Sequence, residues 1–191
     1  MLLSQGNLSR IRGVMIMKIL KNKLVLIIEE ARPEDALEII NFTKQVGTES
    51  NNLGLDEQGI DKTKAQEAKY LTDIKQIPNN IMYVGKIAGK IVSVGGVHGN
   101  QRKKLKHNVD LDISVLKDYW NIGVATHMLE HILNYCRVTK EIENVVLEVR
   151  EDNEFAVELY KKKGFMRIGK YSKNFKVDGE YFDALIMELL L

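Results

Sequence analysis

Cysteine is nearly absent from this sequence, and the scarcity of several other features limits what the protein can be. The single cysteine, Cys136, cannot form an internal disulfide and indicates a reducing compartment, for which we expect the cytoplasm. No apolar run approaches the roughly 18 residues that a membrane-spanning helix needs. The net charge of +2 gives no general attraction to polyanions, so neither nucleic acid nor a membrane surface is an expected partner.

The chain is long enough to bury one sizeable hydrophobic core. Its 191 residues, 45% of them hydrophobic and 28% charged, have the composition of an ordinary globular domain. Residues 1–20 lack the long apolar region and cleavage site of a signal peptide, and we expect them to be an N-terminal extension or tail. Residues 21–191 show no repeat or low-complexity tract, and we expect them to form a single domain.

Hydrophobic periodicity predicts strands that first form hairpins and then alternate with helices. The expected strands are 24–28, 81–85, 91–97, 109–115, 145–149, 165–170 and 181–189. The expected helices are 33–46, ended by Gly47, followed by 56–76, 124–138 and 154–163. This order favours an α/β fold of mixed α+β type, with a mixed, mostly antiparallel sheet of six to seven strands and helices on both faces.

A glycine turn, Tyr119–Thr126, stands between an expected strand and an expected helix. Gly123 allows the backbone to approach a ligand closely, and the first turn of the helix offers unpaired N–H groups at the positive end of its dipole. The turn has neither the G-x-G-x-x-G pattern of dinucleotide sites nor the Gly-Lys-Ser/Thr of a P-loop. It therefore predicts a binding site for some other phosphorylated ligand.

A second segment makes this prediction specific. The pattern N-x-x-A-x-x-x-Y-x-x-x-G-F is matched by Asn153, Ala156, Tyr160, Gly164 and Phe165. With this pattern and a turn that looks like a Q/R-x-x-G-x-G/A loop, the chain resembles the GCN5-related N-acetyltransferase (GNAT) family over roughly residues 24–188. Trp120 stands where that family usually has Gln or Arg. The run Leu147-Glu148-Val149-Arg150 before Tyr160 is similar in particular to the ribosomal-protein alanine N-acetyltransferases.

The resemblance implies an acetyl-CoA-dependent N-acetyltransferase without a metal, acting on a primary amine by direct attack on the thioester. In the family, two parallel strands splay apart to admit the pantetheine arm, and here these would be 109–115 and 145–149. The residues that the resemblance assigns to the cofactor are Ile113, Val115, Ile122, Gly123, Val124, Ala125, Thr126, Asn153 and Tyr160. Asn153 is also a good helix N-cap, and both roles are compatible.

The resemblance makes Tyr160 the general acid that protonates the leaving thiolate, and Glu148 the general base. An amine arrives protonated at neutral pH, so some group must accept its proton. Asp110 and Asp112 alternate along one strand face and compete with Glu148 for that role, as does a relay of water molecules. The simpler interpretation of all three carboxylates is an exposed strand face.

The sequence leaves other functions open. His127, Glu130 and His131 form the H-x-x-E-H pattern of some zinc peptidases, but we expect both histidines on a solvated helix face and no zinc. A non-catalytic acyl-CoA-binding or regulatory module is the main alternative. The acceptor amine could belong to a protein N-terminus, a polyamine, an amino acid or an aminoglycoside, and a homodimer is compatible with the sequence.

Overall fold

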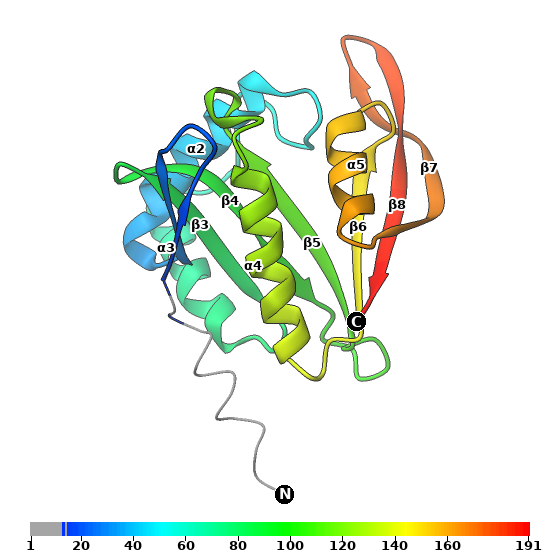
Figure 1. Ribbon diagram of the computed structural model, residues 1–191, viewed down its shortest axis with the longest axis horizontal. Coiled ribbons are helices and arrows are strands. Elements are labelled where there is room, and N and C mark those ends of the chain that lie inside the picture. Colours follow the sequence, from blue (N-terminus) through cyan, green and yellow to red (C-terminus); the bar gives the residue numbers. More distant parts are fainter. Residues whose placement is uncertain (1–12, 14) are drawn as a thin grey trace, which may run out of the picture.

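The computed structural model describes Gly13 and residues 15–191, and its centre is an eight-stranded sheet (Figure 1). The strands are β1 (Ile16–Ile19), β2 (Val25–Glu30), β3 (Ile81–Ile87), β4 (Lys90–Gly99), β5 (Asn108–Val115), β6 (Asn144–Arg150), β7 (Met166–Val177) and β8 (Glu180–Leu190). Their order is β1-β2-β3-β4-β5-β6-β8-β7, and every neighbouring pair is antiparallel except β5 and β6, which are parallel. The predicted mixed, mostly antiparallel sheet is confirmed, with slightly more strands than expected.

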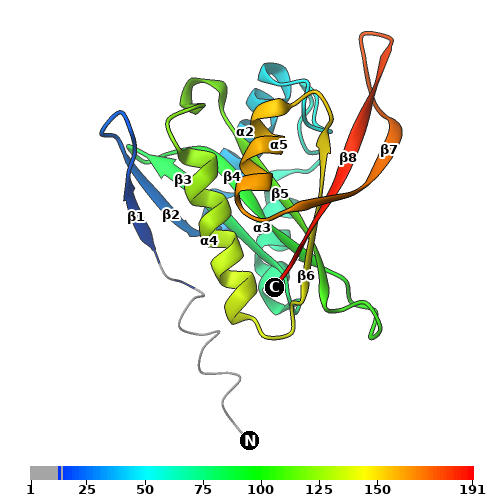
Figure 2. The same ribbon diagram turned by 45° about the vertical axis from the view of Figure 1, so that its right-hand side comes forward.

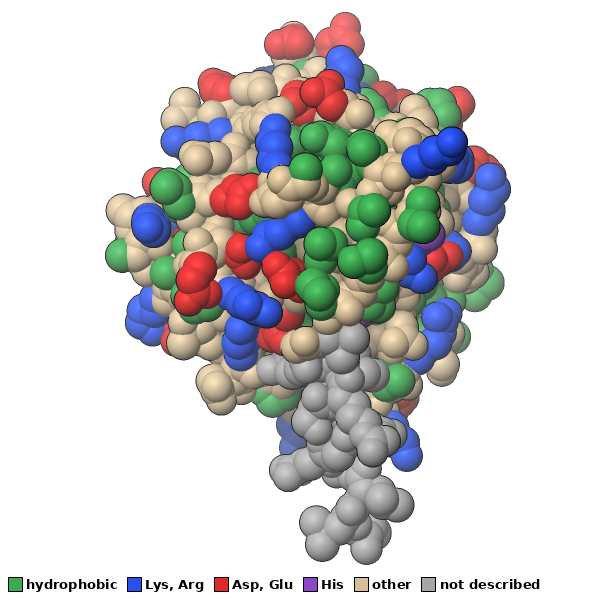
Figure 3. Space-filling view, turned by 60° about the vertical axis from the view of Figure 1, so that its left-hand side comes forward, with side chains coloured by type: hydrophobic (Ala, Val, Ile, Leu, Met, Phe, Trp, Pro, Cys, Tyr) green, Lys and Arg blue, Asp and Glu red, His purple; other side chains and the backbone are tan. Residues whose placement is uncertain are grey.

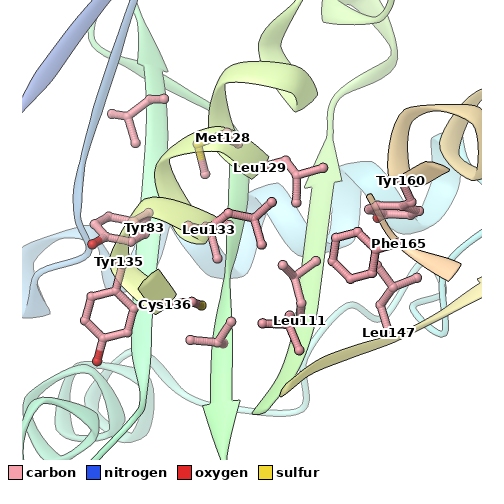
Figure 4. Packing of buried hydrophobic residues seen from close by; sticks show 14 of the residues in the cluster. Tyr83, Leu111, Met128, Leu129, Leu133, Tyr135, Cys136, Leu147, Tyr160 and Phe165 are labelled. Carbon is pink, nitrogen blue, oxygen red and sulfur yellow. The ribbon is translucent and has the colours of Figure 1, made fainter. Parts of the chain in front are cut away.

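Helices cover both faces of the sheet, as predicted. They are α2 (Ala36–Glu49), α3 (Lys64–Asp73), α4 (Val124–Val138) and α5 (Glu154–Lys162), with 3-10 turns η1 (Pro33–Asp35), η2 (Ile74–Gln76) and η3 (Lys117–Tyr119). α2 and α3 pack on one face around a core cluster that includes Phe42 and Leu71. α4 and α5 pack on the other face around a larger cluster that includes Met128 and Tyr160 (Figures 1 and 4). We call these the α2/α3 face and the α4/α5 face.

Two predicted helix boundaries are wrong. α2 continues through Gly47 to Glu49, and a Cβ at Gly47 would lie only 1.9 Å from the Asp56 carbonyl oxygen, so this glycine allows a close approach instead of ending the helix. The segment 51–63 is a loop, and α3 begins only at Lys64. The Thr63 hydroxyl accepts the Gln66 N–H while the Gln66 side chain accepts the Thr63 N–H, a capping box that fixes this later start.

The sheet begins before the domain boundary that the sequence predicts at residue 21. Ile16–Ile19 pairs with Val25–Ile28, and Leu20 is 3% exposed in the core. The rest of the predicted extension, residues 1–12 and 14, lies outside the described residues. Apolar side chains gather on one face of the molecule (Figure 3). β1 leaves Met17 and Ile19 exposed. No described helix is both long and apolar enough to span a membrane.

Candidate active site

β5 and β6 separate along their length (Figures 1 and 2). Their parallel register covers only Asn108–Asp110 against Asn144–Val146. Beyond that point β5 remains paired with β4 up to Val115, and β6 remains paired with β8 up to Arg150. We call the region where the two strands are no longer paired with each other the strand split.

The backbone of Ile113 and Val115 faces the strand split. The Leu116 N–H donates to the Val92 carbonyl on β4, and in an antiparallel ladder every second residue shares such a hydrogen-bonded pair. Ile113 and Val115 are the intervening residues, so their N–H and C=O groups point away from β4, toward β6. The Val115 carbonyl accepts the indole N–H of Trp120 at 2.7 Å. Buried backbone groups need partners, and an extended ligand with amide groups, such as a pantetheine arm, fits that need.

The glycine turn leads from the end of β5 into α4. Gly123 is the N-cap of α4 with a φ of 106°, a left-handed conformation that favours glycine. The first helical hydrogen bond runs from the His127 N–H to the Gly123 carbonyl, so the N–H groups of Val124, Ala125 and Thr126 precede the helical ladder. The Lys21 N–H donates to the Ile122 carbonyl at 3.3 Å, which joins the turn to the β1–β2 hairpin. This geometry suits a phosphate group.

Tyr160 lies at the same split, on α5. Asn153 caps this helix, since its side-chain oxygen accepts the Ala156 N–H at 3.3 Å, and Tyr160 follows about two turns later. The Tyr160 and Phe165 rings meet edge to face, 5.6 Å apart, beside Leu111 of β5 and Leu147 of β6 (Figure 4). Burial, and next the charge of Asp112, raise the pKa of Tyr160 to about 12, so the phenol keeps its proton at neutral pH.

The three candidate carboxylates lie on the α2/α3 face. Their strand neighbours Val109, Leu111, Leu147 and Val149 fill the core of the opposite face, and side chains alternate along a strand. Asp110, Asp112 and Glu148 are all exposed. Glu148 accepts a hydrogen bond from the Asn174 side chain at 2.9 Å. The charge of Asp112 contributes, after burial, to the raised pKa of Tyr160.

Two further residues at this site were missed by the sequence analysis. His98 of β4 lies with its Nε2 2.9 Å from the Asp112 Oδ1. Arg150 of β6 is 5% exposed and donates from Nη1 to the Asn51 carbonyl at 2.8 Å. The Leu-Glu-Val-Arg run drew attention to Glu148 alone, because the burial of Arg150 and its partner Asn51 become visible only in the fold.

The histidines of α4 do not form a metal site. His127 lies 3.3 Å from Glu130, whereas His131 is 5% exposed and packs against the Tyr83 ring with 4.4 Å between ring centroids. The expectation that both histidines lie on a solvated face is therefore wrong for His131, because α4 turns this residue toward β3. Within the described part of the chain, no group of three or more His, Cys, Asp or Glu residues could hold a metal ion.

Comparison with known proteins identifies the family. The model of the Acetyltransferase (GNAT) family matches residues 53–165, more than half of the chain, and the chain belongs to this family. It is 29% identical to N-alpha-acetyltransferase 50 of Danio rerio, over 63% of this chain and 70% of that protein. It is 32% identical to the L-amino acid N-acetyltransferase AaaT of Escherichia coli (strain K12), over 53% of this chain and 62% of that protein. The family and these relatives show the chain to be an N-acetyltransferase.

Solved structures share the fold. An acetyltransferase of the GNAT family from Streptococcus pneumoniae superposes with a TM-score of 0.84 at 30% identity, over 87% of this chain and 99% of that chain. The yncA protein of Salmonella typhimurium, solved with its cofactor acetyl-CoA, has a TM-score of 0.75 at 14% identity, over 87% and 94%. A ribosomal-protein-alanine N-acetyltransferase from Brucella melitensis has a TM-score of 0.70 at 16% identity, over 86% and 99%. The last two likenesses show the fold alone.

Proposed function

We propose that this protein transfers the acetyl group of acetyl-CoA to a primary amine that attacks the thioester directly in the strand split. The observation that carries the proposal is the loss of β5–β6 pairing beyond Asp110 and Val146, with the backbone of Ile113 and Val115 directed into the gap. The glycine turn lies at the end of β5, where the pyrophosphate would meet the free N–H groups of α4. Asn153 caps α5 and thereby fixes the helix that carries Tyr160.

The chemistry requires one proton to leave the amine and one to reach the thiolate. The amine nitrogen forms a bond to the thioester carbonyl carbon, the carbon–sulfur bond then breaks, and the sulfur takes a proton from Tyr160. A phenol with a pKa of about 12 is a weaker acid than a thiol, whose usual pKa is roughly 8.5. Donation is therefore uphill unless the phenolate regains a proton at once from the ammonium group of the addition intermediate.

The proton acceptor belongs on the α2/α3 face, opposite the ring of Tyr160. The sequence proposes Glu148, with Asp110 or Asp112 as competitors. Asp112 on β5 and Glu148 on β6 both stand beyond the last paired residues of the two strands, whereas Asp110 is itself paired with Val146. The case for Glu148 as the base rests on its motif. The hydrogen bond that it accepts from the Asn174 side chain would hold the carboxylate in one orientation.

We propose an α-amino group, on an amino acid or a peptide N-terminus, as the acceptor. The support is the pair of relatives named above, one called an N-alpha-acetyltransferase and the other an L-amino acid N-acetyltransferase. The loop 51–63 and the strand pair β7–β8 border the α2/α3 side of the strand split and would shape the acceptor site, as the Arg150 and Glu148 contacts indicate. A cytoplasmic location and a homodimer stay predictions of the sequence.

Two measurements test the proposal in order. Acetyl-CoA should raise the melting temperature, because a ligand at 100 times its dissociation constant stabilises the folded state by about 2.7 kcal/mol. Free amino acids, short peptides, polyamines and aminoglycosides are then compared as acceptors by the rate of thiol release. If saturating acetyl-CoA does not raise the melting temperature, the assignment of acetyl-CoA as the cofactor is wrong. Thiol release stimulated only by polyamines would keep the transferase and overturn the α-amine assignment.

A further inference from the structure

His98 and Asp112 form a side-chain pair beside the strand split. In the β4–β5 register, His98 lies opposite Asp110 and Gly96 lies opposite Asp112, so His98 and Asp112 project from the same sheet face. The His98 Nε2 and the Asp112 Oδ1 are 2.9 Å apart. The His98 side chain is 41% exposed and that of Asp112 58%, so a substrate can reach both groups.

Asp112 stands on β5 beyond Asp110, the last residue of this strand that pairs with β6, so the pair lies along the strand split. Burial and then Asp112 raise the pKa of Tyr160 on α5. Burial, the Glu67 charge and then Asp112 raise the pKa of Tyr70 on α3. The charge of Asp112 therefore contributes to the raised pKa of a tyrosine on α5 and of one on α3.

The electrostatics of the site favour the imidazolium form of His98. The hydrogen bond that His98 donates to Asp112 and the charges of Asp112 and Asp110 raise the pKa of His98, while burial and the charge of Lys62 lower it, and the net shift is upward. A histidine with a modestly raised pKa is a better match to the proton of an amine than a carboxylate, whose usual pKa of about 4 makes it a much weaker base.

We propose that His98, oriented by Asp112, accepts the proton that the acceptor amine releases, a role that rests on the proposed function. In the neutral ring, Nε2 donates its hydrogen to Asp112, so Nδ1 carries the free electron pair. An N–H bond of the protonated substrate, an ammonium group, breaks, its electron pair stays on nitrogen for attack on the thioester carbonyl, and the proton moves to Nδ1; the second proton leaves the addition intermediate for the Tyr160 phenolate. Asp112 stabilises the imidazolium, which then passes the proton to water.

The test needs variants that separate chemistry from folding. His98→Gln keeps a hydrogen-bond donor for Asp112 and removes the base. Asp112→Asn keeps the ring and removes the charge that raises its pKa. His107→Gln is the matched control, because the contacts of this histidine are made by its backbone carbonyl, which accepts the N–H groups of Glu143 and Asn144. Acetyl-CoA should raise the melting temperature of all three variants as it does for the wild type.

Two readouts decide the inference. In the free protein, a proton NMR titration of the histidine rings should show a His98 pKa that Asp112→Asn lowers and His107→Gln leaves unchanged. With an acceptor from the amine screen, kcat/KM should fall on the acid side with that same pKa. His98→Gln should lower kcat roughly 10²–10⁴-fold and remove this limb, and Asp112→Asn should move it to lower pH.

The outcomes distinguish this inference from the proposed function. A His98→Gln enzyme with wild-type kcat and an unchanged acid limb overturns the role of His98 while acetyl transfer stands. If Asp112→Asn leaves the acid limb of the pH–rate profile where it is in the wild type, Asp112 does not tune His98 and the role of the pair is overturned. A wild-type protein that binds acetyl-CoA but acetylates none of the amines overturns both.

Discussion

The Nη1 of Arg150 donates to the carbonyl of Asn51 at 2.8 Å, which ties the loop between α2 and α3 to β6 across the strand split. Nε and Nη2 donate one hydrogen bond each to Oδ1 and Oδ2 of Asp152 in a fork, and the guanidinium lies 3.8 Å from the centre of the Phe182 ring. One buried side chain therefore joins the loop that follows α2 to the C-terminal half of the sheet.

Arg150→Lys should loosen this loop while leaving the cofactor side intact. Lysine cannot make the paired hydrogen bonds to Asp152, and it has no planar group to stack on the Phe182 ring. We therefore expect a loss of about 1–3 kcal/mol in unfolding free energy. The acceptor KM should rise more than kcat falls, with an unchanged acetyl-CoA dissociation constant. Arg137→Lys, on the exposed end of α4, is the control. Equal KM values in the two variants would show that Arg150 does not position the acceptor loop.

Gly123→Val should weaken acetyl-CoA binding at least ~10-fold, about 1.4 kcal/mol, because a side chain there covers the first turn of α4. The φ of 106° also strains any other residue, at a cost of about 1–2 kcal/mol in stability. Gly179→Val is a matched control, since this glycine of the β7–β8 turn has a φ of 85° and nothing within 4 Å of an added Cβ. Similar acetyl-CoA affinity in both variants, measured by calorimetry, would place the phosphate site elsewhere.

Tyr160→Phe should lower turnover by roughly 10²–10⁴, the usual contribution of a general acid. The ring and its contact with Phe165 remain, so acetyl-CoA affinity should change little. Tyr171→Phe removes a hydroxyl from an exposed residue of β7 and should leave turnover unchanged. If the folded Tyr160→Phe enzyme turns over at the wild-type rate, the phenol is not the acid.

His131 should make the fold sensitive to acid. Burial, with a smaller effect of Lys18, lowers the pKa of His131 to about 4, and neither ring nitrogen has a hydrogen-bond partner among the described residues. The unfolded chain therefore binds this proton more tightly, so the stability contributed by the neutral ring is complete above pH 6.5 and is lost as the pH falls toward 4. The shift corresponds to roughly 3 kcal/mol. In urea unfolding, His131→Leu should flatten the pH dependence of the unfolding free energy between pH 6.5 and 4. A slope equal to that of the wild type would contradict this role of His131.

The sequence predicted α4 and α5 well because both begin with a recognisable turn or cap, at Gly123 and Asn153, and keep helical spacing afterwards. The strand split came only from the family resemblance, since local patterns do not specify which strands pair or where pairing ends. Residues 56–63 of this loop were predicted as the start of a helix because their polar side chains resemble a solvated helix surface, and the cap at Thr63 was overlooked.

The roles of His98 and Arg150 depend on contacts between residues far apart in the chain. His98 meets Asp112 because of the β4–β5 register, and Arg150 meets Asn51 because the loop after α2 reaches β6. A hydrophobic pattern in one chain carries no information about such pairs. His131 was predicted to be exposed for a related reason. It lies beside the apolar stripe of α4, and it is buried because Tyr83 of β3 packs against its ring.

Trp120 is the only tryptophan of the chain, and its indole is bonded to a carbonyl that faces the strand split. A ligand that reaches Val115 must change the surroundings of that ring, either by displacing its hydrogen bond or by covering its exposed edge. The tryptophan fluorescence of the protein therefore reports on the strand split alone. Selective excitation of Trp120 can follow cofactor entry in real time, without a label and before any acceptor has been identified.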